Sequence, residues 1–103
     1  MSDSLQLGGN IELSGFRELE PGSMTILKKI VGNYARKFSE QCSSFERLSL
    51  SMKIVHETEA SKKFEVHGMV VDKGKNFTST MTDRNVFVVI DSVLKKIESE
   101  IKK

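Results

Sequence analysis

The sequence predicts an α+β fold, a sandwich in which two helices pack on one face of a four-stranded sheet in the order β-α-β-β-β-α. Two consecutive stretches, 48–54 and 64–70, place an apolar residue or glycine at every second position, which is typical of strands with one buried face. Two further stretches, before and after these strands, repeat apolar residues at helical spacing. Hairpin-connected strands with amphipathic helices on each side in sequence imply one sheet with both helices on a single face.

The N-terminal part of the chain is expected to hold a leader and the first strand. Residues 1–9 are polar and glycine-containing, and no pattern in them indicates a partner. We therefore expect a flexible leader, followed by a single domain that spans residues 10–103. Residues 11–15 alternate between apolar and polar side chains and predict a short strand.

The first helix is predicted to follow Pro21 and Gly22, with Ser23 as its N-cap, and to end near Cys42. Its apolar residues fall within one arc at about 100° per residue. They are Met24, Leu27, Val31, Tyr34, Phe38 and Cys42. Gly32 costs this helix about 1 kcal/mol relative to alanine if the position is exposed. Close approach of a neighbouring element is one reason to keep a glycine there.

The second half of the chain predicts three strands and a helix. A polar loop at 56–61 separates the two alternating stretches, and a turn at 72–75, in which Gly74 can adopt a positive φ, leads to a strand at 76–81. Residues 85–103 predict the second helix, with Asp83 or Asn85 as N-cap. Its apolar stripe consists of Val86, Val89, Ile90, Val93, Leu94, Ile97 and Ile101. Val88 falls on the polar side, where it faces either solvent or the first helix, and its apolar character suggests that the two helices lie side by side and touch there.

Composition narrows the class of protein. Sixteen Lys and Arg against fourteen Asp and Glu give the 103 residues a net charge of +2, too small to indicate nucleic acid by itself, so a basic surface requires segregation of charge. The single cysteine excludes a disulfide within one chain and fits a reducing cytosol. Neither a signal peptide nor a membrane-spanning stretch is evident, so we expect a soluble, cytoplasmic protein.

The exposed cations of the two helices are the main candidates for a binding site. They are Lys28, Lys29, Arg36 and Lys37 on the first helix and Lys95, Lys96, Lys102 and Lys103 on the second. Two adjacent helices on one sheet face could present a shared basic strip for RNA phosphates, and such binding depends steeply on salt because counterions are released. The charge pattern alone fits an ordinary solvated helix surface better.

The remaining reactive residue types are interpreted as structural. His56 falls in a hairpin and His67 on the polar phase of a strand, with no third metal ligand at suitable spacing, although His67 could stack on a base. Cys42 lies on the apolar arc and is expected to pack as a small hydrophobe. No Ser-His-Asp order, phosphate-binding glycine loop or carboxylate pair is apparent. We expect no enzyme, no metal and no cofactor.

Residues 86–91, Val-Phe-Val-Val-Ile-Asp, resemble the start of the final helix of the ribosome hibernation-promoting factors and ribosome-associated inhibitors, in which this segment typically reads Met-Tyr-Ala-Ala-Ile-Asp. The aromatic residue, the Ile and the Asp have the same spacing. The family is also similar in the order of its elements. Two further segments resemble it as well, namely residues 11–15 and the stretch from Lys63 through the Gly74 turn. The resemblance covers about residues 10–103 and is clearest in the second half. Glu98-Ser99-Glu100 departs from it, because the family often has Gln and Arg there.

The resemblance implies a short, single-domain form of this family, with a fold similar to that of double-stranded-RNA-binding domains. It implies contacts between the eight helix cations and rRNA in the decoding region of the small ribosomal subunit, which would block mRNA and tRNA and keep idle ribosomes inactive in a stress response. We expect no membrane or DNA partner, and the oligomeric state stays open with a monomer favoured. The alternative is a protein-interaction module of the same fold, which would use an exposed sheet face or the edge of the first strand.

Overall fold

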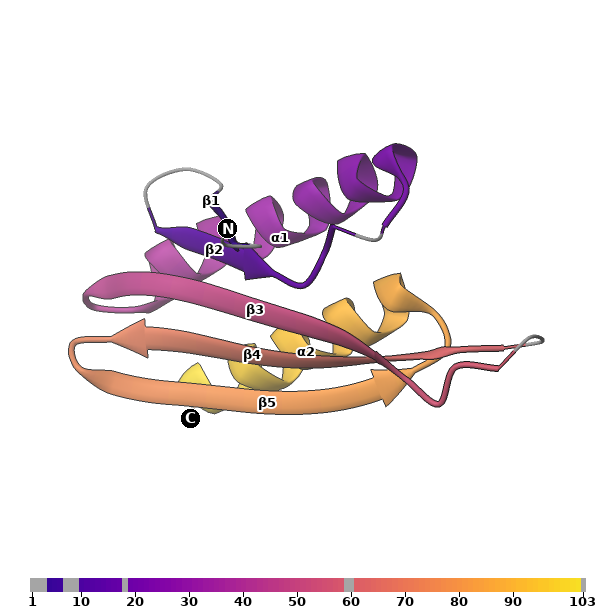
Figure 1. The fold of residues 1–103 in the computed structure, drawn as a ribbon. Helices are drawn as coiled ribbons and strands as arrows, with labels where there is room; N and C mark the ends of the chain where they lie inside the picture. Colours follow the sequence, from indigo (N-terminus) through magenta and orange to yellow (C-terminus); the bar gives the residue numbers. More distant parts are fainter. Residues whose placement is uncertain (1–3, 7–9, 18, 59–60, 103) are drawn as a thin grey trace.

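The computed structural model describes residues 4–6, 10–17, 19–58 and 61–102. Its elements follow the predicted β-α-β-β-β-α order, preceded by one additional short strand (Figure 1). The elements are β1 (Ser4–Gln6), β2 (Ile11–Ser14), α1 (Pro21–Gln41), β3 (Phe45–Val55), β4 (Lys63–Asp72), β5 (Lys75–Asp83) and α2 (Val86–Ile101). The α+β class is confirmed, and β2 to β5 are the four predicted strands.

The strands form one mixed sheet in the order β1-β2-β3-β4-β5. Strands β2 and β3 are parallel, with Leu13 opposite Leu50, because α1 crosses over the sheet between them. Strands β3, β4 and β5 form an antiparallel meander. The turn between β4 and β5 has positive φ angles at Lys73 and Gly74, 54° and 81°, which match the twist of a tight hairpin.

Residues 4–6 differ from the flexible leader that the sequence predicts. They form β1, which pairs antiparallel with β2 and places Leu5 opposite Leu13. Three residues are too few to show the alternation of apolar and polar side chains that predicts a strand. The strand forms here because the outer edge of β2 offers unpaired backbone hydrogen-bonding groups. The rest of the expected leader, residues 1–3 and 7–9, lies outside the described residues.

The core lies between the two helices and one face of the sheet. The predicted arcs are confirmed, since both helices bury their apolar stripes and Met24 and Ile101 pack at the margin of the core. The fully buried side chains of the sheet come from alternate positions, among them Leu48, Leu50 and Val66. The opposite face of the sheet carries mainly Ser, Thr and charged residues.

Two glycines permit close approach to the sheet. Gly15 follows β2 with φ of +81°, and a Cβ there would collide with the backbone oxygen of Met52 in β3. At Gly68 in β4, a Cβ would lie 2.6 Å from Val93 Cγ1 of α2. Because real Cβ contacts are not this short, α2 can rest on β4 at this height only above a glycine. Gly32, by contrast, has open space around it, so close approach does not explain it.

The two helices begin differently. Helix α1 starts three residues earlier than predicted, with Glu20 as N-cap and Pro21 at the first helical position, so the prediction of Ser23 as N-cap is wrong. Proline at this position has a suitable φ and lacks an N–H that the first turn leaves unpaired in any case. Helix α2 is capped by Asn85, whose side-chain oxygen accepts hydrogen bonds from the backbone N–H groups of Phe87 and Val88.

Candidate functional site

Helix α1 presents its cations on its outer surface. Leu27, Val31 and Phe38 turn one arc of the helix into the core, which leaves the other arc in solvent. All four predicted cations of this helix are exposed: Lys28, Lys29, Arg36 and Lys37. Glu40 is the one acidic residue in α1. The surface of α1 is therefore distinctly positive.

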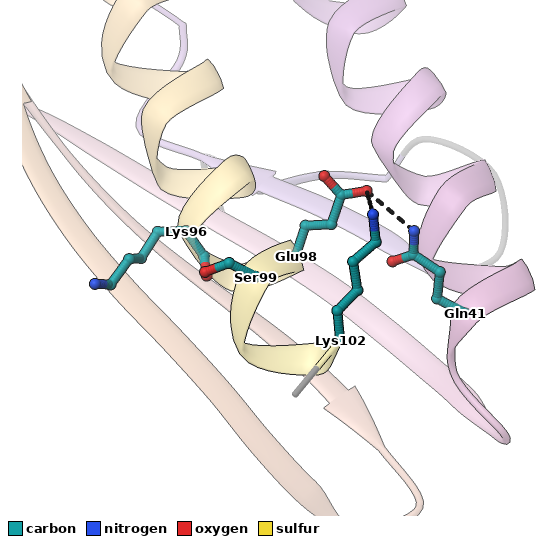
Figure 2. A network of polar contacts seen from close by, with 5 residues as sticks. All are labelled: Gln41, Lys96, Glu98, Ser99 and Lys102. Atoms are coloured by element: carbon teal, nitrogen blue, oxygen red, sulfur yellow. Dashed lines mark hydrogen bonds and ion pairs between the residues drawn. The ribbon is translucent and has the colours of Figure 1, made fainter.

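Helix α2 does not form a comparable surface. Lys95 and Lys96 in the helix and Lys102 at its C-cap are all exposed, but the helix also carries Asp91, Glu98 and Glu100. Lys96 extends from the side of α2 that faces away from α1, whereas Lys102 extends toward α1 (Figure 2). Lys103 lies outside the described residues. The predicted cations of α2 therefore point in different directions among an equal number of carboxylates.

The seam between the helices is polar at its surface. The Tyr34 hydroxyl donates a hydrogen bond of 2.9 Å to Asp91 Oδ1, and Gln41 Nε2 donates one of 3.0 Å to Glu98 Oε2. Each pair joins residues 57 positions apart, so the two helices run in the same direction. These contacts place two carboxylates of α2 next to α1, where they reduce the positive potential of any strip shared by the helices.

Val88 is not part of this seam. Its side chain is 49% exposed, so the prediction that the helices touch there is wrong. The seam instead uses Asp91 and Glu98, which lie two turns apart on one side of α2.

Two cations are held by neighbours in the seam. Lys37 Nζ lies 5.0 Å from the centre of the Tyr34 ring, within the range of a cation–π contact. Lys102 Nζ lies 3.9 Å from Glu98 Oε2, so Glu98 is shared by Lys102 and Gln41 (Figure 2). Burial, followed by the hydrogen bond to Asp91, raises the pKa of Tyr34 to about 12. Tyr34 therefore keeps its proton and donates to Asp91 at neutral pH.

The open face of the sheet holds a shallow hollow of about 260 Å³, lined by Ser51, Met52, Lys53, Glu65 and His67. His67 is exposed, as predicted, and its Nδ1 lies 2.8 Å from Thr80 Oγ1. Lys53 Nζ lies 3.3 Å from Glu65 Oε1. These polar groups are therefore engaged with neighbouring strands.

His56 and Cys42 take structural places. His56 has a positive φ of 53° directly after β3. The Cys42 side chain is 7% exposed, which confirms the core position predicted for it, and burial with the nearby Asp72 raises the pKa of its thiol.

No group of three His, Cys, Asp or Glu residues that could hold a metal ion is found within the described part of the chain. In the same ranges, no helix combines the length and the apolar character that a membrane crossing needs.

Neither the family models nor the curated proteins include a match to this chain. The seven predicted cations that the structure describes fall into a concentrated group on α1 and a dispersed, partly paired group on α2 and its C-cap. Sequence reasoning missed the contacts of Tyr34 and Gln41 across the seam. The apolar periodicity identifies which residues face the core, but it contains no signal for which flanks of two helices meet.

Proposed function

We propose that this protein binds the small ribosomal subunit through its helical layer and inhibits translation by occupying the space of mRNA and tRNA in the decoding region. The proposal rests on the resemblance to the ribosome hibernation-promoting factors and on one observation: α1 exposes four cations and a single carboxylate. In this mechanism the protein excludes other ligands from the subunit and performs no chemistry.

The cations of α1 are suited to contact separate phosphates. Lys28 and Lys29 form one pair and Arg36 and Lys37 another, eight positions further along the helix, which corresponds to about 12 Å. Arginine can bind a phosphate through two parallel hydrogen bonds, whereas lysine acts as a point charge. Recognition would then depend on shape and backbone contacts more than on base identity, as is common for structured RNA.

Helix α2 has a smaller part in this proposal. Its lysines are matched in number by Asp91, Glu98 and Glu100, and Lys102 already lies near Glu98. Binding RNA through Lys102 would have to compete with this ion pair. We therefore expect α1 to supply most of the salt-dependent affinity.

Sedimentation of the protein with purified small ribosomal subunits through a density gradient, at low and then physiological salt, tests the proposal. Lys29→Glu with Arg36→Glu should abolish cosedimentation at physiological salt, because two phosphate contacts become repulsive. Lys95→Glu with Lys102→Glu should weaken it less. The matched control is Lys63→Glu with Lys73→Glu, which changes the net charge equally at the start of β4 and in the turn that follows β4, outside both helices.

Three results distinguish binding through the helical layer from a general effect of the protein's net charge. Retention by the control variant together with loss by the α1 variant supports binding through the helical layer. An equal loss in all three variants would mean that net charge, and not this surface, controls binding. Unchanged cosedimentation of both helix variants would show that the proposed surface is wrong.

The alternative function is a protein-interaction module of the same fold. The balanced charges of α2 favour it, because its carboxylates repel RNA phosphates but can pair with opposite charges on a protein partner. The edge of the first predicted strand no longer suits this role, since β1 pairs with β2 there. A pull-down dominated by a protein that is not ribosomal, and unaffected by nuclease, would support this alternative.

A further inference from the structure

The outer edge of β5 is the long edge of the sheet. Strand β5 stands last in the strand order, and within the described residues it pairs with β4 alone. The pairing with β4 runs without interruption from Lys75 to Asp83. The backbone N–H and C=O groups that point away from β4 along this strand are available to another strand. The opposite edge of the sheet ends in β1, which has three residues.

This edge lacks the usual protection against pairing. Natural edge strands are commonly interrupted by proline, a bulge or a lysine in the middle of the strand. Residues 76–82, Asn-Phe-Thr-Ser-Thr-Met-Thr, contain no charge and no proline, and their register with β4 shows no shift. Threonine and phenylalanine also favour extended structure.

The strand is complementary to itself when two copies run antiparallel about Ser79. In that register Lys75 stands opposite Asp83, and Phe77 stands opposite Met81, each pair occurring twice. Opposite charges and apolar pairs at facing positions are the side-chain pairs that stabilise a sheet. The remaining pairs are Asn76 with Thr82 and Thr78 with Thr80, which are polar and uncharged.

The faces of the sheet also agree with this register. Phe77 and Met81 are partners of Val70 and Val66 in β4, which are both fully buried, so they lie on the helix-covered face. Met81 is nevertheless 42% exposed, because nothing beyond β5 covers it within the described structure. Phe77 of a second copy would lie against it and reduce that exposure.

We propose that two copies of this chain pair through β5, antiparallel and centred on Ser79, to form one continuous sheet. The two-fold axis is perpendicular to the sheet, so both helical layers lie on the same side of the dimer. Strand pairing buries a small area compared with obligate dimers, which makes the association reversible and dependent on concentration. This proposal does not rest on ribosome binding.

Sedimentation velocity from about 1 μM to about 1 mM tests the association. The 103-residue chain should change from monomer to dimer within this range. Met81→Lys places a charge opposite Phe77 of the second copy and should weaken dimerisation about ten-fold or more. Ile26→Lys is the matched control, because Ile26 is also exposed, at 50%, and lies on α1 away from this edge. It should leave dimerisation unchanged.

Cysteine cross-linking tests the register. Ser79→Cys should form an intermolecular disulfide, because the two copies of position 79 face each other across the axis at a suitable separation. Asn76→Cys should not, because in this register its two copies lie about 20 Å apart. A monomer at all concentrations, equal weakening by Ile26→Lys, or cross-linking no better at position 79 than at 76 would each overturn the proposal.

Discussion

Helix α2 rests on β4 above a glycine, whereas α1 contains a glycine that faces open space. Val93 and Ile97 of α2 approach Gly68 so closely that a side chain there would collide with them, while Gly32 in α1 has no neighbour within 4 Å of a Cβ. The charges of the two helices also differ. Counted with their caps, α1 carries four cations with two carboxylates, whereas α2 carries three of each. Packing constraints are thus strongest under α2, and the charged surface is concentrated on α1. Stability and binding should therefore respond to substitutions in different helices.

The largest effect is expected at the contact between α2 and the sheet. Gly68→Val would insert three carbon atoms beside Val93 Cγ1 and Leu50 Cδ2, which would lie 2.6 and 3.1 Å from the first of them. We expect the free energy of unfolding to fall by about 1–3 kcal/mol or more, since the core cannot expand without strain. Urea denaturation measures this change. An unchanged midpoint would mean that α2 packs more loosely than the structure shows.

A smaller effect is expected at the helix starts. Asn85→Ala removes the side-chain oxygen that accepts hydrogen bonds from Phe87 and Val88, and should cost about 0.5–2 kcal/mol. Glu20→Ala is the matched change in α1, where the N-cap side chain makes no capping hydrogen bond, and should cost less than about 0.5 kcal/mol. Thermal unfolding of both variants makes the comparison. Equal losses would contradict the different capping of the two helices.

The seam gives an effect that depends on pH. Tyr34→Phe removes the hydrogen bond to Asp91 and should cost about 0.5–1.5 kcal/mol at neutral pH. Because the pKa of Tyr34 is raised from 10.0 to about 12 in the folded protein, its contribution is present below pH 10 and is lost as the pH rises from 10 to 12. Urea denaturation at a series of pH values measures this loss. Between pH 10 and 12, the free energy of unfolding should fall more steeply with pH for the wild type than for Tyr34→Phe. Parallel curves would show that Tyr34 titrates normally.

The smallest effect is an increase in stability. Gly32→Ala in α1 meets open space, and alanine restricts the unfolded chain and favours the helix, so we expect a gain of about 0.5–1 kcal/mol. Chemical denaturation of the single variant measures this gain. The substitution also leaves all four cations of α1 in place, so cosedimentation with ribosomal subunits should not change. A loss of stability would indicate a contact at Gly32 that the structure lacks.

Most of the fold could be predicted because its elements carry their own periodicity. The alternation in β3 and β4 and the apolar stripe of α2 are long enough to distinguish strand from helix without reference to any partner. The turn at Gly74 was likewise predictable from local residue types, since glycine is the residue that best accepts its positive φ.

The features that were missed depend on partners distant in sequence. Strand β1 exists through its pairing with β2, and three residues show no period. The start of α1 was missed for a local reason instead, because Pro21 and Ser23 both signal a helix start and lie within three residues of each other. The candidate site was predicted least well. Seven of its eight cations lie in the described residues and are exposed as expected, but the sequence contains no signal that Asp91 and Glu98 lie beside α1.

The parallel pairing of β2 with β3 also has a consequence for how the chain folds. Strands β3 to β5 and α2 follow one another directly, so their contacts close short loops, whereas β2 must wait until the whole of α1 has crossed the sheet. We expect the meander and α2 to form the folding nucleus and β2 with α1 to dock afterwards. Core substitutions in α2 should then slow refolding, while those in α1 should mainly accelerate unfolding in stopped-flow measurements. Helix α1, which carries the concentrated group of cations, would therefore pack onto the sheet after α2.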